Sequence, residues 1–134
     1  MQNYQFTLDS QNLKKAIPLA LGLAIVLGIA VALIDFLGGV WGIVLVVAWA
    51  YVGLYFANLT LASGSKPQAL NVGINGAILA AIAGILYDVI SWVVIGIRYQ
   101  NTVSDSIISL YFVETGIIGG LAAFAWYAYK TSAQ

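Results

Sequence analysis

The chain has 134 residues, of which 62% are hydrophobic and 7% are charged, and its mean hydropathy is +0.96. Soluble domains carry about 25% charged residues, so this composition indicates an integral membrane protein with the lipid bilayer as its first partner. Five basic side chains balance five acidic ones, and cysteine and histidine are absent. These counts argue against nucleic-acid binding and exclude disulfides, thiolate chemistry and Cys/His metal sites.

The first 15 residues are polar, and we expect them to form a cytoplasmic N-terminal tail. A loosely ordered tail is the interpretation we favour. Three alternatives stay open. The alternation of apolar and polar residues between Tyr4 and Leu8 is typical of a short strand, or of a segment that places its apolar side chains among the lipid headgroups. Asp9 or Ser10 is also a suitable cap for a short interfacial helix.

The apolar run from Ala16 to Ile34 is the first candidate for a membrane helix. It is longer than the hydrophobic region of a cleaved signal peptide, which spans about 7–15 residues, so we expect it to be retained. A helix over residues 17–37 would cover roughly 31 Å, about the thickness of the hydrocarbon layer. Pro18 suits the first turn of this helix, where its missing N–H removes no hydrogen bond.

Three further apolar runs follow, separated by short polar or glycine-rich connections. Gly38 and Gly39 predict a tight turn, and Gly64 predicts a left-handed C-cap. The fold class is therefore predicted to be all-α, an integral membrane bundle of four antiparallel helices. The helices are expected at residues 17–37, 40–62, 67–98 and 106–129, in one domain from 16 to 130 with a C-terminal tail at 131–134.

Basic and aromatic residues predict the orientation. Four lysines fall on one side of a four-helix topology, and Arg98 falls on the other, where we expect it to reach a headgroup phosphate. The positive-inside rule then places both termini in the cytoplasm, in an inner or plasma membrane. The predicted interface anchors are Lys14, Lys15, Lys66, Arg98, Lys130, Trp41 and Trp126.

A faint internal repeat appears when the sequence is shifted so that Asp35 lies on Asp88, because a stripe of small residues precedes each aspartate. A tandem repeat of two helical hairpins would produce this pattern, as in transporters with parallel repeats. Chance similarity between Ala- and Ile-rich helices is the interpretation we favour.

Acidic residues inside apolar helices are the strongest polar signal. An aspartate at mid-bilayer costs about 2.5–3.5 kcal/mol, so such a residue normally faces protein or water. Asp88 and Glu114 are both expected about 13–15 Å below the outer surface, whereas Asp35 is expected near it. Their role is open between interhelical hydrogen bonding, which we favour, proton or cation handling, and the lining of a site for a small ligand. The candidate polar site comprises Asp35, Asp88, Glu114, Ser91, Tyr111 and Thr115.

Small residues recur at helical spacing and predict close packing between helices. The candidate packing positions are Gly28, Gly73, Ala77, Gly84, Gly116 and Gly120. On the fourth helix, Glu114 and the glycine stripe point in nearly opposite directions, which predicts a second protein-facing side. Asn58, Asn71 and Asn75 are expected to set register through interhelical contacts.

These patterns favour a non-catalytic protein: a structural or accessory subunit of a larger membrane complex, or a homo-oligomer packed through its Gly/Ala stripes. The alternative is a small proton- or cation-handling channel or carrier that uses Asp88 and Glu114. No nucleotide-binding glycine loop, metal-ligand cluster or nucleophile–base pair is recognisable, so we expect neither a cofactor nor enzymatic activity.

Overall fold

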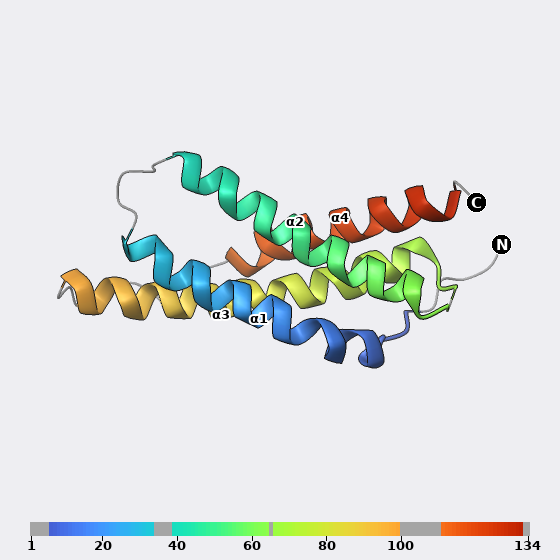
Figure 1. The fold of residues 1–134 in the computed structure, drawn as a ribbon, viewed down its shortest axis with the longest axis horizontal. Helices are drawn as coiled ribbons and strands as arrows, with labels where there is room; N and C mark the ends of the chain where they lie inside the picture. Colours follow the sequence, from blue (N-terminus) through green and yellow to red (C-terminus); the bar gives the residue numbers. More distant parts are fainter. Residues whose placement is uncertain (1–5, 34–38, 65, 100–110, 133–134) are drawn as a thin grey trace.

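The computed structural model describes residues 6–33, 39–64, 66–99 and 111–132, with side chains described for all of these except 32–33, 39 and 95–99. These residues form four α-helices packed together, which confirms the predicted all-α class (Figure 1). The helices are α1 (Ser10–Leu33), α2 (Gly39–Ala62), α3 (Ala69–Tyr99) and α4 (Tyr111–Ser132).

Three of these helices are long and apolar enough to cross a membrane. The spans are Ser10–Val31, Val40–Ala62 and Ala69–Val94. They indicate an integral membrane protein, as the composition predicts. The predicted fourth span begins at residue 106, and residues 100–110 lie outside the described residues, so crossing by the fourth helix stays a prediction. Residue 132 is still helical, so α4 extends into the predicted C-terminal tail.

The first helix begins earlier than the polarity of the sequence predicts. It starts at Ser10, and Asp9 caps it by accepting a hydrogen bond from the Asn12 N–H at 3.2 Å. The preference for a loose tail up to residue 15 is therefore wrong for its helical part, and Asp9 is the capping residue. Pro18 lies inside α1 rather than in its first turn, so the helix lacks one backbone hydrogen bond there.

Successive helices run in opposite directions, and the start of α1 and the end of α4 lie at the same end of the bundle (Figure 1). α3 is the central helix, because it packs along both α4 and α1, while α2 packs mainly on α4. Gly64 has φ +81°, as the predicted left-handed C-cap of α2 requires. The largest fully buried side chains fill the middle of the bundle: Trp49, Phe56, Leu79, Val52 and Val72.

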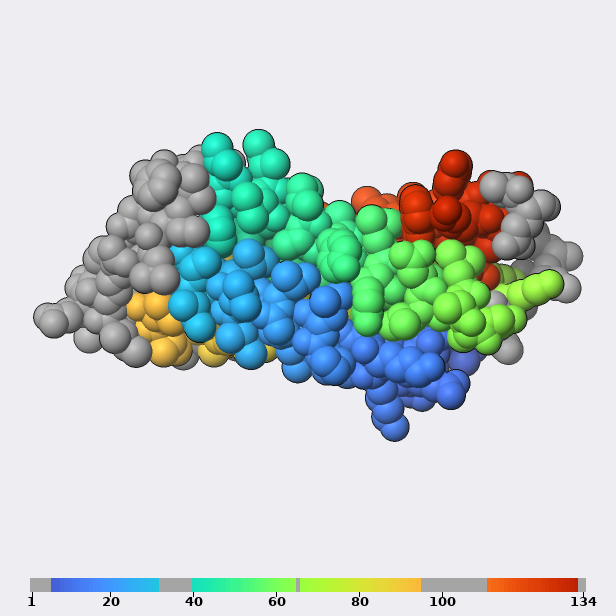
Figure 2. Space-filling view, in the orientation of Figure 1, coloured from blue at the N-terminus to red at the C-terminus, as the bar shows by residue number. Residues whose placement is uncertain are grey.

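The outer surface of the bundle is apolar. Figure 2 shows α1 and α2 side by side on one face of the molecule. Branched side chains project from these two helices, and the most exposed of them are Val26, Val40, Ile43 and Val47. This surface suits contact with lipid chains, since lipid-facing positions need no hydrogen-bonding partner.

Candidate functional site

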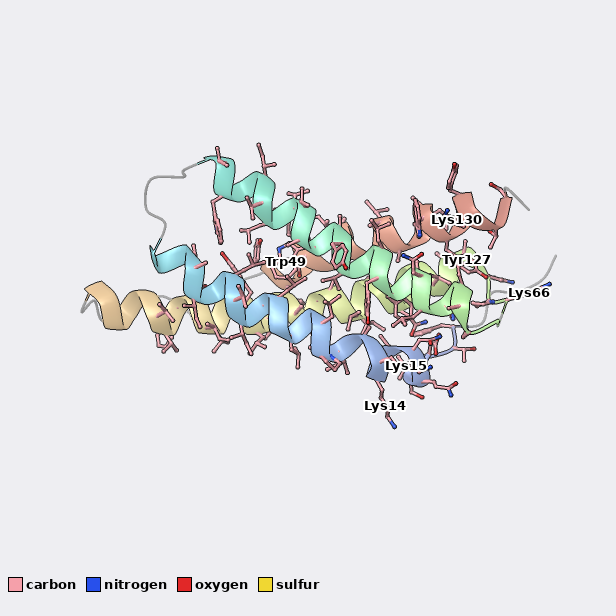
Figure 3. All side chains as sticks on the ribbon, viewed as in Figure 1. Lys14, Lys15, Trp49, Lys66, Tyr127 and Lys130 are labelled. Atoms are coloured by element: carbon pink, nitrogen blue, oxygen red, sulfur yellow. The ribbon has the colours of Figure 1, made fainter. Side chains whose placement is uncertain are left out.

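Four aromatic side chains from three helices form one cluster, which we call the aromatic cluster: Trp41, Trp49, Tyr87 and Tyr111. The Trp41 Nε1–H donates to the Tyr87 hydroxyl at 3.1 Å, and the Trp49 Nε1–H donates to the Tyr111 hydroxyl at 2.9 Å. The Tyr87 ring lies 5.7 Å from Trp49, edge to face, and 5.6 Å from Tyr111. Trp49 is fully buried and points into the bundle from α2 (Figure 3).

The two hydrogen bonds explain why this cluster forms. A buried indole N–H or phenol O–H needs a partner in an apolar medium, and each tryptophan of the pair finds a tyrosine on another helix. Trp92 on α3 is different, because its Nε1 is buried and makes no hydrogen bond. The cluster therefore ties α2 to α3 and to α4 at one level of the bundle.

Two of the candidate acids flank this cluster. Asp88 follows Tyr87 on α3 and is partly buried, while Glu114 lies one turn after Tyr111 on α4 and is exposed. The contact between the Tyr87 and Tyr111 rings therefore brings the segments that carry the two acids together, but Glu114 faces outward within a single chain. Its burial would require a neighbouring molecule.

The level of these acids in the bundle follows from Tyr111. This residue contacts Tyr87, which lies roughly 18 Å along the helix axis before the end of α3 at Tyr99. The described part of α4 accordingly begins well inside the bundle (Figure 1). Glu114, one turn further along, is therefore level with the interior of α3 and not with its end.

The other candidate polar residues contact backbone groups. Ser91 Oγ donates to the backbone carbonyl of Asp88 at 3.0 Å and not to its carboxyl group. Thr115 is fully buried and donates across the helix interface to the carbonyl of Ala80 at 2.9 Å. Asp35 lies outside the described residues.

Close contacts between α3 and α4 involve four of the candidate packing residues. A Cβ atom added to Gly120 would lie 2.7 Å from the Ala77 Cβ and 3.0 Å from the Gly73 carbonyl oxygen, and one added to Gly116 would lie 3.2 Å from the Ala77 carbonyl oxygen. These distances leave no room for larger side chains. Beside this contact, an apolar groove of 380 Å³ opens on the outer surface.

Two more candidate packing residues lie at contacts of α3. A Cβ atom on Gly84 would overlap Thr115 Oγ1, so the glycine makes room for the buried hydroxyl group of α4. A Cβ atom on Gly28 of α1 would lie 2.8 Å from the Ile90 side chain. Small residues therefore bring α3 close to the helices on both sides of it.

A second polar group of residues lies at the other end of α3. The Asn75 side chain accepts from the Asp9 N–H at 2.8 Å and donates to the Thr7 carbonyl at 3.0 Å. The Asn71 side chain accepts from the Thr7 N–H at 2.9 Å. Two amides one turn apart thus hold an extended segment before α1, much as a neighbouring strand would. The spacing of the asparagines and the alternation near Tyr4 were the available signals for this contact.

All four lysines lie toward the end of the bundle at which α1 begins and α4 ends (Figure 3). The candidate anchors there make specific contacts. The Trp126 Nε1–H donates to Asn58 Oδ1 at 2.7 Å, and the Lys130 ammonium group lies 4.7 Å from the centre of the Trp126 ring. This distance is that of a cation–π interaction. The side chain of Arg98 is not among those described.

Within the described ranges, no cluster of three or more His, Cys, Asp or Glu side chains is arranged to hold a metal ion. Comparison with protein-family models, curated proteins and solved structures gives no match for this chain. The class defined by the helices is that of a small helical integral membrane protein, and any statement about its activity rests on the contacts above.

Proposed function

We propose that this chain is a non-catalytic multi-pass membrane protein that acts as a subunit, packed against copies of itself or against other membrane chains. The observation that carries the proposal is the exposed carboxyl group of Glu114, level with the interior of α3. An acidic side chain facing lipid at such a level costs about 2.5–3.5 kcal/mol on insertion scales. A neighbouring protein surface with a hydrogen-bond donor would remove much of this cost.

The groove beside α4 supports the same proposal. It is floored by small residues, and Ile117 and Leu121, on the same exposed face as Glu114, form its outer wall. Small residues allow close approach of a second helix, and membrane helices associate mainly through such packing and through interhelical hydrogen bonds. An apolar groove beside a carboxyl group thus offers a partner helix both close packing and a hydrogen-bond acceptor.

The test is the assembly state in mild detergent, measured by light scattering and by mass spectrometry of the co-purified chains. Leu121→Trp should prevent binding of the partner helix, because the larger indole ring would occupy the groove. Val47→Trp is the matched control: Val47 is 62% exposed and Leu121 is 65% exposed, but Val47 lies on the outer face of α2. A monomer with no associated chain, or equal effects of both variants, would exclude the subunit proposal.

A second function has one specific observation in its favour. Asp88 follows Tyr87 and Glu114 lies one turn after Tyr111, and these two tyrosine rings are in contact at 5.6 Å, an arrangement near which a proton or cation could be held. We expect Asp88→Asn to abolish any pH-dependent flux in liposomes, since the amide keeps the size of the side chain but cannot titrate. Ser91→Ala, one turn away on α3, is the control. Flux that is equal in wild type and Asp88→Asn would reject this function.

Our proposal for orientation places the lysine-bearing end and both termini in the cytoplasm. The positive-inside rule supports it, because the four lysines share one end (Figure 3). The chain has no cysteine, so a single Ser132→Cys variant reports sidedness directly. An impermeant thiol reagent should label it in inverted vesicles and not in intact cells.

A tandem repeat of two helical hairpins would require α1 and α3 to run in the same direction. These two helices run in the same direction in Figure 1.

A further inference from the structure

A hollow of 530 Å³ opens at the lysine-bearing end of the bundle, between the connection from α2 to α3 and the last turns of α4. Lys66 and Tyr127, which both line it, lie at this end in Figure 3. The walls comprise Leu61, Gly64, Lys66, Pro67, Ala69, Tyr127, Ala128, Thr131 and Ser132. Unlike the groove on α4, this hollow has charged and hydroxyl side chains in its wall.

The shape of the hollow is fixed by one contact between its walls. Tyr127 is buried, and its hydroxyl donates to the Pro67 carbonyl at 2.7 Å, which ties α4 to the start of the segment that enters α3. The left-handed conformation of Gly64 turns the chain at the end of α2. A site held in this way exists before a ligand arrives, so little ordering free energy opposes binding.

The two walls differ in chemistry. Lys66 is exposed and can present its ammonium group to an anion; of the acids in the described residues, Asp9 caps α1, and Asp88 and Glu114 lie on the helices that carry the aromatic cluster. On the opposite wall, Thr131 Oγ1 donates to the Tyr127 carbonyl at 2.9 Å.

Ser132 Oγ donates in the same way to the Tyr129 carbonyl at 3.0 Å. With their hydrogens engaged, the Thr131 and Ser132 hydroxyls offer only oxygen acceptors to a ligand. The C-terminal end of α4 also carries a partial negative charge, which favours a cationic donor there.

Residues typical of a membrane interface lie beside the hollow. Trp126 and Tyr129 pair at 6.0 Å on the adjacent turns of α4, and Lys130 covers the Trp126 ring. Tryptophan, tyrosine and lysine gather at the headgroup level of membranes. The molecules present at highest concentration at this level are phospholipids, whose headgroups carry a phosphate.

We propose that this hollow binds the headgroup of a phospholipid of the ethanolamine type. The phosphate pairs with the Lys66 ammonium group, and the headgroup ammonium donates to the hydroxyl oxygens of Thr131 and Ser132. A choline headgroup has the same charges but no N–H, so it satisfies Lys66 and leaves the opposite wall without a donor. Selectivity for ethanolamine over choline headgroups is the distinctive property of this site.

The experiment is native mass spectrometry of the full chain in detergent, with phosphatidylethanolamine or phosphatidylcholine of identical acyl chains added. The ethanolamine lipid should bind more tightly. Lys66→Gln should weaken its binding by up to about fivefold, the factor that corresponds to the upper value for one exposed ion pair. Lys14→Gln, an exposed lysine outside the hollow, is the control and should leave binding unchanged. Equal losses in the two lysine variants would overturn the proposal.

Two further measurements separate headgroup recognition from general effects. A double variant, Thr131→Val with Ser132→Ala, removes both hydroxyl acceptors and should abolish the preference for ethanolamine while leaving binding of the choline lipid as it is. A retained preference would contradict the assigned role of the hydroxyl wall. Phosphoethanolamine without acyl chains is the last comparison. Binding as tight as that of the lipid would reject a lipid headgroup as the natural ligand and assign the hollow to a soluble phosphate compound.

Discussion

Gly53 marks the closest approach of α2 to α4, and its substitution gives the sharpest test of the fold. A methyl group added there would overlap the backbone carbonyl of Gly119 and lie 3.1 Å from the amide nitrogen of Ala123. Because both are backbone atoms, no change of rotamer relieves the overlap. Gly53→Ala must therefore move the two helices apart.

The magnitude follows from a control on the same helix. A methyl group on Gly42 would meet no neighbouring atom within 4 Å, so Gly42→Ala changes only helix propensity and gains at most about 1 kcal/mol. Gly53→Ala gains the same free energy from helix propensity, but the added methyl group overpacks the contact, which costs about 1–3 kcal/mol. We expect the free energy of unfolding of Gly53→Ala to be about 1–3 kcal/mol lower than that of Gly42→Ala.

The assay is reversible unfolding in mixed micelles, with sodium dodecyl sulfate as denaturant and tryptophan fluorescence as the signal. Trp49 lies one turn from Gly53 and is fully buried, so it reports loss of packing at this contact. Equal stability of Gly53→Ala and Gly42→Ala would refute the direct backbone contact between α2 and α4.

Two hydrogen-bonded contacts give further predictions. Trp49→Phe removes the donor to Tyr111 and should lower the free energy of unfolding by about 0.6–1.7 kcal/mol, the average to the maximum for interhelical hydrogen bonds in membranes. A double-mutant cycle with Tyr111→Phe should show that the two effects are coupled, and strictly additive effects would contradict the contact. Asn75→Leu removes the acceptor of the Asp9 N–H and should speed hydrogen exchange at that amide about tenfold, whereas Asn58→Leu should not; unchanged exchange in Asn75→Leu would exclude this role.

The number and type of helices could be predicted from the sequence because both depend on local patterns. Three of the four apolar runs form helices long and apolar enough to cross a membrane, and glycine marks an end, as at Gly64 with φ +81°. The start of α1 depends instead on Asn71 and Asn75, which are distant in sequence. Their side chains hold Thr7 and place Asp9 as the cap. A prediction made from neighbouring residues in the sequence cannot include a contact between residues that are more than 60 positions apart.

The candidate site was predictable in part for a similar reason. Acids in apolar helices stand out because burying them is costly, so Asp88 and Glu114 could be selected from the sequence alone. The aromatic cluster could not, because Trp41 resembles an interface anchor and its bond to Tyr87 depends on how α2 lies against α3. The exposure of Glu114 is likewise a property of the packed bundle.

The contacts also explain how these helices keep their register. Lipid chains are as apolar as the helix surfaces, so apolar burial alone does not select one arrangement in a bilayer. The side-chain hydrogen bonds between the aromatic residues at one level, and from Asn75 and Tyr127 near the other end, supply that selection. The middle of the bundle is held by close packing. Asp88→Asn keeps the size of the side chain and is not part of these four bonds, so the unfolding assay on this variant separates an effect on flux through chemistry from one through folding.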